Sequence, residues 1–129
     1  MPGWGTGSFE NEEAQNFLSQ LNSLSVDDLS PILARATDHG YLDAPASTVT
    51  IVVAEIVATA RGNPPAAVPS QITEWIAKIE GSPSSPMSDL ARRAVEKVRT
   101  NSELKDLWLE AEGLNEWSAT LRELEERLT

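Results

Sequence analysis

The chain has 129 residues, of which 40% are hydrophobic, and this size and composition are typical of one folded domain with its own core. Cysteine is absent, which excludes a disulfide framework, a thiolate metal site and a cysteine nucleophile. The formal net charge of -10 opposes binding to nucleic acids, because their affinity for proteins depends on cationic contacts with phosphate.

The chain opens with MPGWGTGSFE, in which glycines alternate around a tryptophan. Glycine is needed where φ is positive or where two backbones approach closely. We therefore expect the first ten residues to form an arm packed on the helices, with Gly5 and Gly7 at tight backbone positions and Trp4 as the anchor. Asn11 or Ser8 then caps the first helix.

These glycines do not indicate a nucleotide site. A Walker loop ends in a lysine that reaches the phosphates, and a dinucleotide-binding motif follows a strand. The opening segment has neither feature. Glu12 and Glu13 already complement the positive end of the first expected helix, and they would repel a phosphate.

The rest of the sequence has a helical period in nearly every segment. Such amphipathic segments cover a shared core, so we expect an all-α fold, an irregular bundle of about seven helices in a single domain over residues 1–129. The apolar residues that follow this period are Ala14, Phe17, Leu18 and Leu21; Ile72, Trp75, Ile76 and Ile79; Met87, Leu90, Ala94 and Val98; Leu104, Leu107, Trp108 and Ala111; and Trp117, Leu121, Leu124 and Leu128.

Polar residues and glycines mark the expected ends of these helices. Proline at positions 31 and 86 follows a serine, as it does at the first position of many helices. The expected N-caps are Asn11, Ser25, Ser47, Ser70 and Asn101, and the glycines expected just after helix C-termini are Gly40, Gly62, Gly81 and Gly113.

The segment STVTIVVAEIVATA is rich in β-branched residues, which favour a strand on propensity alone. Its apolar residues nevertheless cover one helical face and part of a second, and it is longer than most strands. No other segment alternates apolar and polar residues well enough to pair with it. We therefore predict a helix over residues 48–61 that is buried at the centre of the bundle.

The segment TDHGYLDA contains the candidate ligand-site residues His39, Tyr41 and Asp43. Together with Asp38 they are suitable for acid–base chemistry or a carboxylate metal site. A usual zinc or iron site is not expected, because His39 is the only histidine. The alternative is a structural helix end, in which His39 complements the helix dipole, Gly40 closes the helix and the following residues fold back onto the core.

Acidic residues concentrate towards the two ends of the chain. Residues 1–60 contain eight acids and a single base, Arg35, and residues 103–126 contain eight acids and two bases. Between them lies a short basic run, ARRAVEKVRT, which we expect to pair with acidic neighbours in the fold. An acidic surface of this kind favours a basic protein partner.

No stretch approaches the roughly 18 to 20 consecutive apolar residues that cross a bilayer. The N-terminus also has no basic region followed by an apolar one, so a signal peptide is not expected. We therefore expect a soluble, cytoplasmic protein with no membrane partner.

The opening block, WGTG followed by an aromatic residue, an acid–Asn–acid run and an alanine, resembles the start of a bacterial family catalogued as a domain of unknown function, number 4259. Later stretches are similar too, namely GYL at 40–42, AEIVA at 54–58, NSEL at 101–104 and Trp117. The resemblance spans most of the chain, although only the opening block is specific. It implies a small soluble bacterial protein, and it implies no activity and no functional residues.

Together these observations favour a non-enzymatic protein that binds a protein partner, because the acidic charge is strong and no catalytic constellation is recognisable. A more specific alternative is an immunity- or antitoxin-like inhibitor of a basic toxin enzyme, since opposite charge steers encounter. A different alternative is a ligand-binding domain or enzyme with a pocket near Trp4, His39 and Tyr41. No cofactor and no metal is expected, and the oligomeric state is left open.

Overall fold

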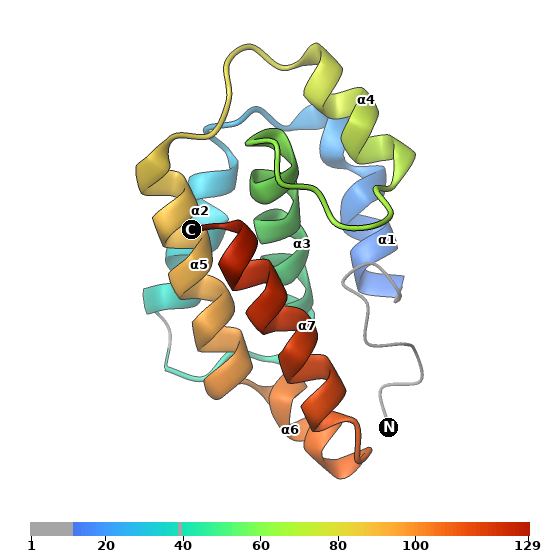
Figure 1. Ribbon diagram of the computed structural model, residues 1–129, viewed down its shortest axis with the longest axis vertical. Helices are drawn as coiled ribbons and strands as arrows, with labels where there is room; N and C mark the ends of the chain where they lie inside the picture. Colours follow the sequence, from blue (N-terminus) through green and yellow to red (C-terminus); the bar gives the residue numbers. More distant parts are fainter. Residues whose placement is uncertain (1–11, 39) are drawn as a thin grey trace.

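The computed structural model describes residues 12–38 and 40–129. Six residues named above therefore lie outside the described residues: Trp4, Gly5 and Gly7 of the expected arm, the cap candidates Ser8 and Asn11, and His39. The described residues form seven α-helices and one short 3-10 helix: α1 (Glu12–Ser19), η1 (Leu21–Ser23), α2 (Leu29–Asp38), α3 (Ala44–Ala60), α4 (Ser70–Lys78), α5 (Ser85–Thr100), α6 (Glu103–Glu110) and α7 (Leu114–Arg127). This confirms the expected all-α bundle (Figure 1).

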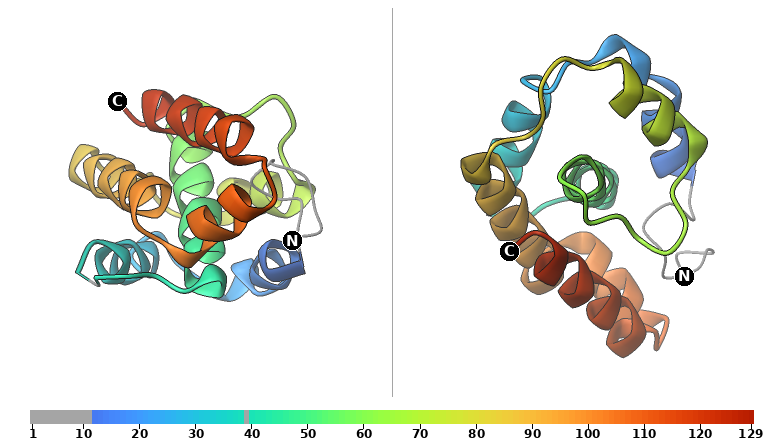
Figure 2. Two further views of the ribbon diagram at one scale, coloured as in Figure 1. Left: turned by 90° about the horizontal axis from the view of Figure 1, so that it is seen from below. Right: turned by 45° about the horizontal axis from the view of Figure 1, so that its top comes forward.

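Helix α3 is the centre of the bundle. It contacts α1, α2, α5, α6 and α7, and a view close to its axis shows the other helices arranged around it (Figure 2). Every residue from Ile51 to Ala58 is buried. The prediction of a helix over residues 48–61 is confirmed, because packing on all sides of α3 overrides the strand propensity of its β-branched residues.

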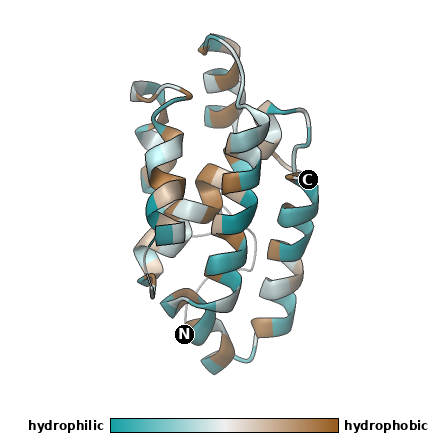
Figure 3. Ribbon diagram, turned by 90° about the vertical axis from the view of Figure 1, so that its left-hand side faces the viewer, coloured by the Kyte–Doolittle hydropathy of each residue, from teal (hydrophilic) through white to brown (hydrophobic). Residues whose placement is uncertain are grey.

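The outer helices are amphipathic, and hydrophobic and hydrophilic residues alternate around them (Figure 3). In the C-terminal part, Trp117, Leu121, Leu124 and Leu128 are all buried, as their spacing predicts. Helix α4 is the most peripheral, because it packs on α1 and η1 and makes no comparable contact with α3. No helix in the described ranges is long and apolar enough to cross a membrane.

Four of the expected N-caps are wrong. Ser25 lies four positions before Leu29, the first residue of α2, and its hydroxyl donates to Asp28. Helix α3 is capped by Asp43, whose Oδ1 accepts a hydrogen bond of 2.8 Å from the N–H of Ala46. Ser47 is instead buried in the first turn of the helix. Ser102 caps α6, because the side chain of Asn101 instead donates to a backbone carbonyl across the fold. Ser70 is itself the first residue of α4 and forms no cap.

The glycines near helix ends have two different roles. Gly62, with a φ of 93°, follows the C-cap of α3 as expected for a residue that closes a helix. Gly81 also has a positive φ, of 79°, but it lies three positions after the end of α4, whose C-cap is the extended residue Ile79. After α6 the positive φ falls on Glu112, at 60°, and not on the neighbouring Gly113. Gly113 is required for close packing, because a Cβ atom there would lie 2.7 Å from Cε3 of Trp108.

Candidate functional site

The chain between α2 and α3 is tied to the junction of α5 and α6. The N–H of Glu103 donates to the carbonyl of Leu42 at 2.8 Å, and the carboxylate of Glu103 accepts the N–H of Ala44 at 2.7 Å. The side chain of Asn101 donates to the carbonyl of Gly40. These bonds join segments about sixty residues apart in the sequence and fix residues 40–44 against the start of α6.

Tyr41 and Asp43, two of the three candidate ligand-site residues, lie in this segment. The carboxylate of Asp43 caps α3, and the hydroxyl of Tyr41 donates to Oδ2 of Asp106 at 2.6 Å. That hydrogen bond is the main cause that raises the pKa of Tyr41 to about 12, and the negative charges of Asp106, Glu103 and Glu110 raise it further. Tyr41 is therefore a neutral hydrogen-bond donor at neutral pH and not a base.

His39 lies outside the described residues, so its proximity to Tyr41 and Asp43 stays a prediction. Among the described residues, no group of three histidine, aspartate or glutamate side chains is arranged to hold a metal ion. In the described part of the TDHGYLDA segment Leu42 is buried, as the helix-end alternative expects, whereas Tyr41 is exposed and bonded to α6 and Asp43 caps α3.

An exposed surface of mixed apolar and acidic character surrounds the hydroxyl of Tyr41. Tyr41 and Leu109 are the two large hydrophobic residues that are exposed in the described part of the chain, each at 56%. Residues three and four positions apart share one face of a helix, so Leu109 and Glu110 lie beside Asp106 on α6. We call Tyr41, Asp106, Leu109 and Glu110 the end patch, because α6 lies at one end of the bundle (Figure 1).

Two arginines of the described structure are held in ion pairs with carboxylates. Arg99 Nε lies 2.7 Å from Glu125 Oε2, as expected, whereas Arg92 and Arg93 of the same basic run form no ion pair with the described residues. Arg127 Nη1 lies 2.7 Å from Glu55 Oε1. Arg127 also pairs with Glu123. Since Glu55 is only 2% exposed, Arg127 neutralises a carboxylate in the middle of α3. These arginines therefore add little positive charge to the surface.

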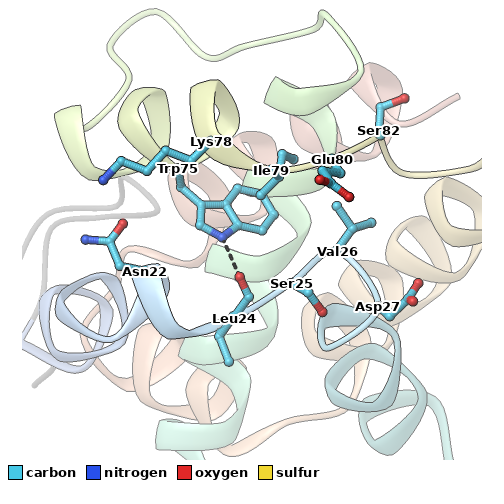
Figure 4. A pocket seen from close by; sticks show the side chains of 11 residues that line it. Asn22, Leu24, Ser25, Val26, Asp27, Trp75, Lys78, Ile79, Glu80 and Ser82 are labelled. Carbon is cyan, nitrogen blue, oxygen red and sulfur yellow. Dashed lines mark hydrogen bonds between the residues drawn. The ribbon is translucent and has the colours of Figure 1, made fainter.

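A hollow of about 510 Å³ lies between α4 and the loop that follows η1 (Figure 4). Trp75 lines it and is anchored by its Nε1, which donates to the carbonyl of Leu24 at 2.8 Å. Lys78 lies at one end and Asp27 and Glu80 lie towards the other (Figure 4). Both signs of charge are thus present, and no one ligand chemistry is favoured over another.

Sequence reasoning missed Asp106, Leu109 and Glu110 as members of one surface with Tyr41. The exposure of Leu109 could have been predicted from the sequence. Leu109 lies between Trp108 and Ala111 of the apolar stripe on α6 but does not belong to that stripe, so its side chain points away from the core. The Tyr41–Asp106 contact had none, since the two residues are 65 positions apart.

Comparison with known proteins identifies one relationship. A family model described as a domain of unknown function, DUF4259, matches residues 3–120. No curated protein and no solved structure matches the chain.

Proposed function

This chain belongs to the DUF4259 family, and we propose that it is a non-enzymatic protein-binding module that engages a basic partner through the end patch. The observation that carries the proposal is the pairing of two exposed apolar side chains, Tyr41 and Leu109, with the carboxylates of Asp106 and Glu110. We further propose, from the family resemblance and the composition, that the protein is bacterial and acts in the cytoplasm.

The residue types of the end patch match those of protein interfaces. Energetically important interface residues are enriched in tyrosine, and they lie among polar groups that exclude water from the contact. Tyr41 offers an aromatic ring and Leu109 offers a neighbouring aliphatic side chain. A single exposed apolar residue is common on protein surfaces and needs no explanation. Tyr41 and Leu109, however, both lie beside the carboxylate of Asp106, and together they supply the apolar centre of a small interface.

The end patch is also ordered before any partner arrives. Residues 40–44 are held by hydrogen bonds from Glu103 and Asn101, and the ring of Tyr41 is oriented by its bond to Asp106. A side chain that is already fixed loses less conformational entropy on binding. This supports a surface built for recognition.

The charge of the molecule indicates which partner the end patch favours. The chain carries a net charge of -10, and the described structure gives Glu110 no hydrogen bond and no ion pair. A lysine or arginine of the partner would pair with Glu110 and Asp106, while its aliphatic stem covers Leu109. A basic toxin enzyme would be one partner of this class, and the protein would then act as its inhibitor.

The proposal is tested by kinetic binding to a partner recovered from the source cell by cross-linking to the full chain. Leu109→Ser and Glu110→Lys should each weaken binding, and Glu110→Lys should chiefly lower the association rate. The matched control is Glu74→Lys, because Glu74 is an exposed acid on the peripheral helix α4. Association should also slow between about 0.01 M and 0.15 M salt, where the Debye length falls from about 30 Å to about 8 Å. Equal binding by all three variants would reject the end patch as the interface.

A further inference from the structure

We propose that an apolar hollow between α2 and the first half of α3 binds a small monocarboxylate with an aliphatic body, and that Arg35 pairs with the carboxylate. The hollow has a volume of about 280 Å³. Its apolar lining consists of Ile32, Ala36, Leu42, Pro45, Ala46 and Val49. It is separate from the end patch, so this inference goes beyond the proposed function.

Arg35 is the one charged residue among the described residues that line the hollow. Arg99 and Arg127 are held by carboxylates and Arg61 by the carbonyl of Pro83, whereas Arg92, Arg93 and Arg122 share with Arg35 the lack of a partner among the described residues but do not line this hollow. Within residues 12–38 and 40–129, Arg35 has neither a hydrogen bond nor an ion pair, and it is exposed. An unpaired guanidinium beside an apolar surface matches a ligand with a carboxylate head and an apolar body.

The polar atoms deeper in the hollow do not compete for such a ligand. The hydroxyl of Thr50 already donates to the carbonyl of Ala46 at 2.8 Å, and the N–H of Ala46 donates to Asp43. The interior of the hollow therefore presents mainly methyl and methylene groups, which favour an aliphatic chain. Arg35 is therefore the residue that would bind the carboxylate of the ligand.

The size of the hollow and the charge of the molecule favour a small anion over a macromolecule. Since a water-sized group occupies roughly 30 Å³, the hollow accommodates roughly nine such groups, which suits a short alkyl chain and not a helix. An acidic protein segment would be repelled by the net charge of -10, and a basic one would be repelled by Arg35. A small monoanion carries a single negative charge, and the adjacent Arg35 offsets its repulsion by the rest of the molecule.

The experiment uses octanoate, below the concentration at which it forms micelles, added to the full chain labelled with nitrogen-15. We expect saturable shifts of the amide signals of Ala46, Val49 and Thr50, with no comparable change at Trp75 in the larger hollow. Each methylene that enters the hollow should tighten binding about fourfold, so hexanoate should bind roughly fifteenfold more weakly than octanoate.

Two variants separate the charge from the apolar surface. Arg35→Gln should weaken octanoate binding about fivefold and leave the binding of the neutral octan-1-ol unchanged. Arg122→Gln is the matched control, since it removes the same charge from an exposed site on α7 and should change neither affinity. Ala46→Trp should fill the hollow and prevent binding of both ligands, and its amide spectrum reports whether the fold is kept.

Three results would overturn the proposal. The first is the absence of saturable shifts at the hollow. The second is an affinity for octanoate that is the same in Arg35→Gln as in the unchanged protein. The third is an affinity for carboxylates that rises with their alkyl chain length in Ala46→Trp as much as in the unchanged protein.

Discussion

Replacing Gly113 with alanine should lower stability by overpacking the core beneath α6. A Cβ atom at this position would lie 2.7 Å from Cε3 and 2.9 Å from Cζ3 of Trp108. Ordinary contact begins near 3.4 Å, so the ring would have to move by about 0.7 Å, and it is only 7% exposed. Overpacking of this kind costs about 1 to 3 kcal/mol, which corresponds to a fall of roughly 4 to 12 °C in the melting temperature.

The assay is thermal unfolding of the two matched variants Gly113→Ala and Gly40→Ala. A Cβ atom added at Gly40 would meet no heavy atom within 4 Å, and the φ of Gly40 is not positive, so its alanine variant should unfold at or slightly above the wild-type temperature. Gly113→Ala should cost less in a Trp108→Leu background, because the clashing ring is then absent. Equal melting temperatures for Gly113→Ala and Gly40→Ala would refute the reasoning.

Three further predictions concern ion pairs, ionisation and the arm. Arg127→Gln should destabilise by about 3 kcal/mol in denaturant unfolding, because it leaves Glu55 buried without this cation, whereas Glu123→Gln at the exposed side of the same pair should cost less than about 1 kcal/mol. The single tyrosine, Tyr41, should titrate near pH 12 when followed by its near-ultraviolet absorbance, and Asp106→Asn should move that midpoint towards 10. Because the pKa of Tyr41 is raised in the folded state, the Tyr41–Asp106 hydrogen bond stabilises the fold below pH 10, and this contribution is lost as the pH rises towards 12. Deleting the first eight residues should lower the melting temperature if the sequence-based prediction of a packed arm is right, and an unchanged value would contradict it.

The fold was predictable because burial leaves a periodic trace in the sequence. The stripe Trp117, Leu121, Leu124 and Leu128 and the doubly apolar segment of α3 each indicated a helix and its buried side, and both are confirmed. Helix starts were less certain. Ser47 and Asp43 are both good N-caps, and only the position of Pro45 in the first turn and the bonds of residues 40–44 to α6 select Asp43.

The candidate surfaces were less predictable because their members come from distant segments. The end patch depends on a bond between Tyr41 and Asp106, and the apolar hollow depends on the packing of α2 against α3 beside Arg35. Neither residue type nor spacing carries that information. Arg35 was visible in the sequence as the single base of residues 1–60, but its lack of a partner among the described residues is a property of the folded molecule.

The burial of Glu55 has a consequence for the chain before it folds. Its segment, TIVVAEIV, combines β-branched and apolar residues without proline, which is the composition of segments that aggregate as strands when exposed. A single charge inside such a segment discourages association between unfolded chains. In the native bundle that charge is neutralised by Arg127, so the same carboxylate protects the nascent polypeptide and is then accommodated by the last helix. Replacing Glu55 and Arg127 together with aliphatic residues would therefore be expected to be tolerated in the folded state and to raise losses to insoluble material during synthesis.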